Sequence, residues 1–291
     1  CEGTAGARLL ESVGKIPVPN TPPRSRRLPV STGDEARLFD LGYRRYDGPR
    51  HRPAVAIGTL AWFTAKRVLG LGRGARHKVL PALTLVIAFL PALINVLASV
   101  IADDLLEEDL ISYGDYTTVI GAALTLFAAL VAPEALCPDR RTGMLGLYLA
   151  GPLDRVRYLV GKAIAVFGLM LLITIGPLLF MLLAFEVAGY GESAGELPVL
   201  LLKILATGLA TALMYTSLSL AVSSFTTRRA AAAVATVLLL AVPVFVVRTA
   251  IDSADAPAEL DLLSSPFVAA ELAYRIFGET SDDTEAPLYE L

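Results

Sequence analysis

The chain has 291 residues, of which 55% are hydrophobic and 18% are charged, and its formal net charge is −3. An average soluble domain is about 45–50% apolar and about 25% charged. This composition excludes a disordered chain, a coiled coil and a nucleic-acid-binding tail protein. Five apolar stretches of about 20 residues predict an all-α, polytopic bundle of transmembrane helices embedded in the lipid bilayer.

The N-terminal part of the chain predicts two segments outside the bilayer core. Residues 1–53 are rich in Pro, Arg and Gly without an apolar period, which predicts a flexible, basic cytoplasmic arm. Residues 54–78 begin with a mildly amphipathic stretch that contains Trp62, Lys66 and Arg67. Aromatic and basic residues together are typical of a helix along the membrane surface, here followed by a glycine-rich hinge. A spanning helix is excluded because Lys66 and Arg67 interrupt its apolar run.

Residues 79–250 form the predicted transmembrane domain. Its spans are expected at about 79–102, 117–136, 159–185, 198–225 and 230–250. Pro133 and Pro138 are expected to stop the second span, and a Gly176-Pro177 break interrupts the third. Lys162 lies near a span end, where a lysine side chain can snorkel to the headgroups.

The distribution of charge predicts the orientation. Of the 25 Lys and Arg residues, 15 precede the first span, which places the N-terminus in the cytoplasm. The loop after the first span is acidic and lies outside, whereas the loop at 137–158 carries four arginines and lies inside. Residues 251–291 are an acidic extracytoplasmic segment. These assignments alternate along the chain and predict a multi-pass protein of the cell (plasma) membrane.

The inside loop at 137–158 is the most informative segment for function. It contains a charged turn over residues 139–143, a short apolar helix over residues 144–150, and a Gly151-Pro152 stop before the third span. That helix is too short to cross a bilayer. A short helix between two charged turns suits the docking of a cytoplasmic partner. An ordinary loop with interfacial anchors is the alternative.

Residues 134–162 carry the pattern E-x4-D-R-R-T-G-x-L-x-L-Y-L-A-x-P-L-x-R-x2-Y-x2-G-K. This pattern resembles the membrane subunit of the second type of ATP-binding cassette (ABC) exporters. Residues 41–50, 225–230 and 263–267 resemble the same family, so the resemblance covers nearly the whole chain from about residue 40. It implies a permease that couples ATP hydrolysis by a separate subunit to substrate translocation.

The resemblance also implies partners and a site. Such permeases have six spans and work as dimers, so we expect a second permease subunit, identical or paralogous, and a sixth span lost from the C-terminus. Cytoplasmic ATPase subunits, which bind ATP and Mg, would dock on a coupling helix at about residues 141–151, and residues 54–71 would be the connecting helix. The expected ATPase-coupling interface consists of Glu134, Asp139, Arg140, Arg141, Gly143, Leu149, Pro152, Arg155 and Lys162.

Missing motifs support an external energy source. The sequence has no G-x-x-x-x-G-K-[ST] motif, so we expect a chain that is not an enzyme and binds no cofactor itself. The span centres lack Asp, Glu and His, which a proton- or sodium-coupled carrier would need. Cys1 and Cys137 suggest neither a disulfide framework nor a metal site. Binding of nucleic acid is not expected. A non-transporting membrane scaffold or assembly protein is the alternative.

Polar residues inside the spans have two interpretations. The fourth span is rich in hydroxyl groups, and Asn95 lies in the first span. Such residues allow close helix packing with interhelical hydrogen bonds, or they line a translocation path. The candidates for either role are Asn95, Thr211, Tyr215 and Ser219.

Overall fold

A computed structural model of the chain describes residues 53–72, 74, 76–101, 112–149, 153–189, 195–254 and 257–278. The predicted arm, apart from Pro53, lies outside these residues. Residues 50–291 form one compact unit. Every element in the described part of the chain is helical, and five helices are long and apolar enough to cross a membrane. The predicted all-α bundle with five spans is therefore confirmed.

The helices follow one another in a simple order. They are α2 (Pro53–Val68), α3 (Arg76–Ile101), α4 (Tyr113–Val119), α5 (Gly121–Arg141), α6 (Met144–Leu149), α7 (Arg155–Ala188), α8 (Leu197–Phe225), α9 (Arg229–Ala254), the 3-10 helix η1 (Ala258–Leu263) and α10 (Ser265–Phe277). The five candidate spans lie in α3, α5, α7, α8 and α9.

Two predicted breaks are wrong. Helix α5 continues through Pro133 and Pro138, and α7 continues through Pro177. Proline is tolerated inside a membrane helix where neighbouring groups satisfy the carbonyl that it leaves free. The predicted inside loop at 137–158 is also shorter than expected. Helix α5 continues through Pro138 to Arg141, and α7 begins at Arg155.

Helix α5 forms the centre of the bundle. In its most apolar stretch 67% of the residues are buried, compared with 22% in those of α3 and α9. The exposed faces of α3 and α9 are apolar and include Leu90, Ile94, Leu238 and Phe245. In a bilayer such faces lie against lipid or another subunit.

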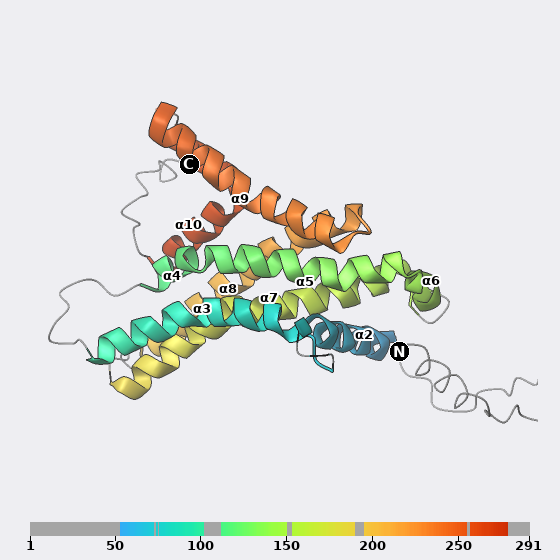
Figure 1. Cartoon of the computed structure of the whole chain (residues 1–291). Coiled ribbons are helices and arrows are strands. Elements are labelled where there is room, and N and C mark those ends of the chain that lie inside the picture. Colours follow the sequence, from blue (N-terminus) through green and yellow to red (C-terminus); the bar gives the residue numbers. More distant parts are fainter. Residues whose placement is uncertain are drawn as a thin grey trace, which may run out of the picture. The chain divides into compact units, whose positions relative to one another are not determined.

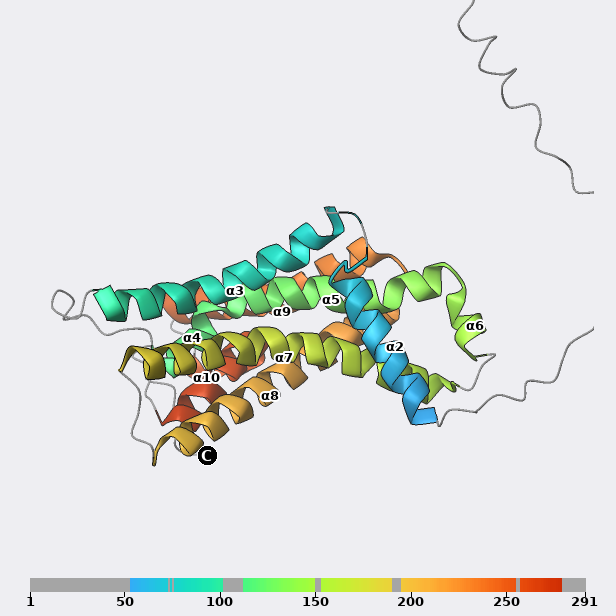
Figure 2. The ribbon, with the colours of Figure 1, turned by 90° about the horizontal axis from the view of Figure 1, so that it is seen from below.

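The two ends of α5 carry different structures. Helix α6 lies at one end and α4 with α10 at the other, in both views (Figures 1 and 2). We refer to these as the α6 end and the α4 end. Helix α2 crosses α7 near the α6 end (Figure 2).

At the α4 end, α10 packs against α4 and α8. The rings of Tyr113 and Phe277 stack with centroids 5.6 Å apart, and the Tyr274 hydroxyl donates to Asp115 Oδ1 at 2.6 Å. That hydrogen bond holds the pKa of Asp115 below its ordinary value. Lys203 Nζ donates to the carbonyl of Phe277 at 2.8 Å. Helix α10 is not predicted from the sequence, which indicates only an acidic segment at residues 251–291.

Candidate functional site

The continuation of α5 beyond Pro138 is explained by a residue of α2. Proline has no backbone N–H, so Pro138 leaves the carbonyl of Glu134 without its intrahelical donor. The guanidinium of Arg67 replaces that donor: Nη2 lies 2.9 Å from the oxygen of Glu134 and 3.3 Å from that of Ala135. Arg67 therefore stabilises the last turn of α5 and joins α2 to it.

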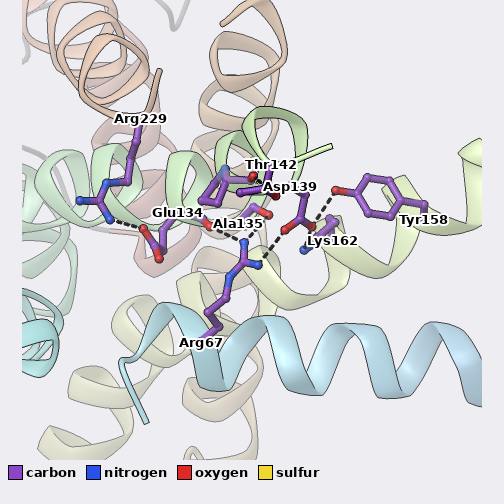
Figure 3. A network of polar contacts seen from close by, with 9 residues as sticks. Arg67, Glu134, Ala135, Asp139, Thr142, Tyr158, Lys162 and Arg229 are labelled. Carbon is purple, nitrogen blue, oxygen red and sulfur yellow. Dashed lines mark hydrogen bonds and ion pairs between the residues drawn. The ribbon is translucent and has the colours of Figure 1, made fainter. Parts of the chain in front are cut away.

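Asp139 is the centre of a buried ionic network (Figure 3). Its Oδ1 accepts from Arg67 Nη1 at 2.7 Å, and its Oδ2 accepts from Lys162 Nζ at 2.7 Å and from the Tyr158 hydroxyl at 3.0 Å. The side chains of Asp139 and Lys162 are 2% and 1% exposed. The network joins α2, α5 and α7.

The charges of this network do not cancel. Arg67 and Lys162 contribute two positive charges, and Asp139 contributes one negative charge. Removal of one partner from a buried ion pair leaves an uncompensated charge away from water, which costs about 3–5 kcal/mol. The Asp139 carboxylate is therefore the group on which the whole cluster depends.

Close contact between α2 and α7 brings the network together. A Cβ atom at Gly161 would lie 2.9 Å from Leu60 Cδ2 and 3.3 Å from the carbonyl oxygen of Ile57, both in α2. Glycine at this point of α7 therefore allows α2 to pack closely against it. Gly161 directly precedes Lys162, so the helix crossing and the ionic network occupy the same level.

Two further contacts join the same end of α5 to α8 and α9. Glu134 Oε2 lies 2.5 Å from Arg229 Nη1, at the start of α9. Arg140 donates to the carbonyl of Ser224, in the last turn of α8. Carbonyls in a last turn have no intrahelical donor, so Arg140 satisfies one of them. The end of α5 thus contacts four other helices through charged side chains.

Helix α6 follows α5 after a single tight turn. Gly143 has a φ of 71°, which places it in the left-handed region where glycine is favoured. Thr142 closes the turn by donating from its hydroxyl to the carbonyl of Pro138 at 2.8 Å. The turn leaves no flexible linker between α5 and α6.

One face of α6 is anchored and the other is free. Leu145 and Tyr148 pack on a small cluster that includes Leu60 and Tyr158, and the rings of Tyr148 and Tyr158 lie 5.6 Å apart. Leu147 points away and is 67% exposed. Helix α6 therefore presents an apolar side chain to the surface while its base is fixed to α2, α5 and α7.

The predicted interface residues separate into two groups. Arg140, Arg141, Gly143 and Arg155 are exposed, and Leu149 is half-buried. Asp139 and Lys162 are buried, and Glu134 is 12% exposed at its side chain. Pro152 lies outside the described residues. Lys162 does not snorkel to the headgroups, because the Asp139 carboxylate binds its ammonium inside the bundle.

Three residues that form these polar contacts were not predicted: Arg67 and Tyr158 of the ionic network, and Arg229, which pairs with Glu134. The sequence predicts Arg67 only as a basic residue of a helix along the membrane surface. The sequence did contain one signal, because Pro138 inside a helix requires an external donor for residue 134. The identity of that donor depends on how α2 packs against α5 and α7.

The predicted intramembrane residues are all deeply buried in the described part of the bundle. Asn95, Thr211, Tyr215 and Ser219 are all at least 97% buried, the first in α3 and the others in α8. Ser219 donates to the carbonyl of Thr216 at 3.3 Å. Thr211 lines a small cavity at the α4 side of the bundle, which none of the other three lines.

A larger cavity lies beside the ionic network. It measures about 340 Å³ and is lined mainly by apolar residues of α2, α3, α5 and α9, together with Arg67, Glu134 and Arg229.

The described part of the chain contains no group of three His, Cys, Asp or Glu residues that could hold a metal ion.

Comparison with protein families matches residues 54–285 to the family described as ABC-2 family transporter protein. No curated protein and no solved structure matches the chain. The family match covers all the described helices except the first residue of α2, and with them the ionic network. The chain therefore belongs to the ABC-2 transporter family and is a multi-pass membrane component of a transporter.

Proposed function

We propose that this chain is the permease subunit of an ATP-driven exporter and that a separate cytoplasmic ATPase subunit docks on α6. The ATPase subunit would bind ATP and Mg, and this chain would convert the resulting movement into substrate translocation. The arrangement at the end of α5 carries the proposal: the exposed helix α6 is joined by one tight turn to a helix that contacts α2, α7, α8 and α9.

The proposal assigns different roles to exposed and buried residues. Arg141 and Leu147 lie on the outer surface, where they would contact the ATPase. Asp139 and Lys162 are buried behind α6, where they would keep α2, α5 and α7 together as α6 moves. Without these contacts, displacement of α6 would bend one helix and leave the others in place.

The orientation follows from charge. Thirteen of the 25 Lys and Arg residues precede α3, and Arg140, Arg141, Arg155 and Arg157 gather around α6. Basic residues remain on the cytoplasmic side during insertion. The α6 end would therefore face the cytoplasm, with the N-terminus on the same side, in the cell membrane.

A second permease subunit, identical or paralogous, would complete the translocation path. The family resemblance supports this proposal. The exposed apolar faces of α3 and α9 provide surfaces on which such a subunit could pack.

The test uses a purified complex between this chain and its candidate P-loop ATPase. Both the affinity of the complex and its ATP turnover are compared between the unmodified chain and its variants. Arg141→Glu combined with Leu147→Asp is expected to weaken the complex at least tenfold, about 1.4 kcal/mol. Glu196→Lys reverses an exposed charge at the α4 end and is expected to leave association unchanged.

Unchanged association and turnover in the double variant would remove α6 as the docking site. A scaffold or assembly protein, the second candidate, would form a complex whose ATP turnover does not respond to either variant and which transports nothing after reconstitution.

A further inference from the structure

All three threonine hydroxyls of α8 lack a hydrogen-bond partner among the described residues, and two of them lie close together along the helix. Thr207 and Thr211 are 1% and 2% exposed, and neither Oγ1 contacts a protein donor or acceptor. They lie four residues apart and so share one face of the helix. A buried hydroxyl without a partner costs about 1–3 kcal/mol.

Most threonines in the other helices behave differently. Thr84, Thr125, Thr174, Thr236 and Thr249 each donate to a carbonyl of their own preceding turn, at distances of 2.7–3.1 Å. This bond is the usual one for a threonine inside a helix. Thr207 and Thr211 do not form it, although the same acceptors exist in α8. Thr216 and Ser223 of α8 also lack a partner, but they do not line the cavity described next.

A small cavity receives both hydroxyl-bearing side chains. Its walls come from α4, α5, α7 and α8 and from the residue between α4 and α5: Thr117, Ile120, Leu124, Thr174, Leu178, Thr207, Gly208 and Thr211. Its volume is about 10 Å³, counted as the positions open to the centre of a water molecule. About 10–15 Å³ on this measure is enough for one water.

The lining determines which ligand fits. A buried water needs two to four polar partners, and this cavity offers four threonine side chains, of which Thr207 and Thr211 have uncommitted hydroxyls. No charged side chain lines it, so a cation would lose its hydration without gaining a counter-charge. Thr174 already donates to Met170, and its oxygen can still accept.

We propose that one structural water molecule occupies this cavity, hydrogen-bonded to Thr207 and Thr211. The site lies at a close approach of α7 and α8, where a Cβ atom at Gly208 would collide with the Ile175 side chain. Thr174 Oγ1 also lies 3.2 Å from the carbonyl of Gly208. The water therefore completes the polar contacts of a helix crossing that has no room for a larger side chain.

Paired substitutions at each threonine test this proposal. Valine keeps the volume of threonine and removes its hydroxyl, whereas serine keeps the hydroxyl and removes a methyl group. With a bound water, Thr207→Val and Thr211→Val lower the midpoint of thermal unfolding in lipid nanodiscs by about 2–4 °C more than the serine variants. Thr236→Val, at a buried threonine already bonded to Ala232, measures the cost of losing an ordinary intrahelical bond.

If the cavity contains no water, the valine variants should be more stable to heat than the serine variants. Valine would then remove an unpaired hydroxyl and raise the midpoint or leave it unchanged, while serine would lower it by losing packing. That result would overturn the proposal. If the variants do not fold, a structure of the unmodified chain at about 2 Å decides: density within hydrogen-bond distance of both hydroxyls supports the water, and clear absence of density refutes it.

Discussion

The two ends of this bundle are held together by different chemistry. At the α6 end, charged side chains from α2, α7 and α9 converge on α5, and Asp139 and Lys162 are almost completely buried. At the α4 end, α10 is held by stacked aromatic rings, a tyrosine hydroxyl and the partly exposed carboxylate of Asp115.

This difference has a mechanical consequence. Buried ion pairs are costly to separate, because each charge left alone is desolvated. Partly exposed hydrogen bonds exchange with water at little cost. The α6 end is therefore expected to move as one unit, whereas α10 is expected to separate more easily from α4.

The largest expected effect is at Asp139. Asp139→Asn removes the carboxylate of the buried cluster and leaves Arg67 and Lys162 as neighbouring cations, so we expect the free energy of unfolding to fall by about 3–5 kcal/mol. Unfolding in mixed detergent micelles measures this loss. Asp154→Asn is the matched control, because the Asp154 side chain is 61% exposed in its pair with Arg157 and should contribute less than about 1 kcal/mol. Equal losses in the two variants would contradict the account.

Lys162→Met tests whether the carboxylate or the lysine is the essential member of the buried cluster. Asp139 would keep its bonds to Arg67 and Tyr158, so this variant is expected to lose less stability than Asp139→Asn. The same unfolding measurement ranks the two variants. A larger loss for Lys162→Met would show that the lysine, rather than the carboxylate, is the essential member.

A smaller effect is expected at the pair that joins α5 to α9. The Arg229 side chain is 63% exposed, so water screens its attraction to Glu134. Glu134→Gln and Arg229→Gln should each cost about 1 kcal/mol or less. The double reversal, Glu134→Arg with Arg229→Glu, should recover part of that loss in the same assay. If the double reversal instead loses as much stability as the two single changes combined, the two side chains do not interact.

The α4 end is expected to respond to pH. The Tyr274 hydroxyl lowers the pKa of Asp115 from its ordinary 3.8, so its stabilising effect is complete above that value and is lost as pH falls through the folded-state pKa. Tyr274→Phe should cost about 1 kcal/mol at neutral pH, and its difference from the unmodified chain should shrink below about pH 4. Unfolding midpoints across pH measure this. Tyr148→Phe, at the α6 end, is the control. The difference in unfolding midpoint between this variant and the unmodified chain should not change with the titration of Asp115.

The smallest effect on stability is expected at the exposed surface. Arg141 is exposed, so Arg141→Glu should change the free energy of unfolding by no more than about 0.5 kcal/mol. Its effect should be confined to association with the ATPase subunit, measured on the same preparation. A large loss of stability would place Arg141 among the structural residues instead.

The sequence allowed the helical fold to be predicted because apolar length alone defines a spanning helix. It did not reveal that α5 passes through Pro138, because the replacement donor, Arg67, lies about 70 residues earlier in the chain. Asp139 and Lys162 were both selected from the motif, yet their ion pair depends on how α5 packs against α7. Helix α10 was not predicted because its 13 residues are too few to span a bilayer.

The central claim is that the surface formed by α6 faces the cytoplasm and is available to a partner there. The most direct measurement is labelling of Leu147→Cys by a membrane-impermeant maleimide, in a Cys1→Ser background expressed without an ATPase subunit. Cys137 is 1% exposed and should not react, and Glu196→Cys at the α4 end is the control. The account predicts that intact cells label residue 196 but not residue 147, and that permeabilised cells label both. Labelling of residue 147 in intact cells would contradict it.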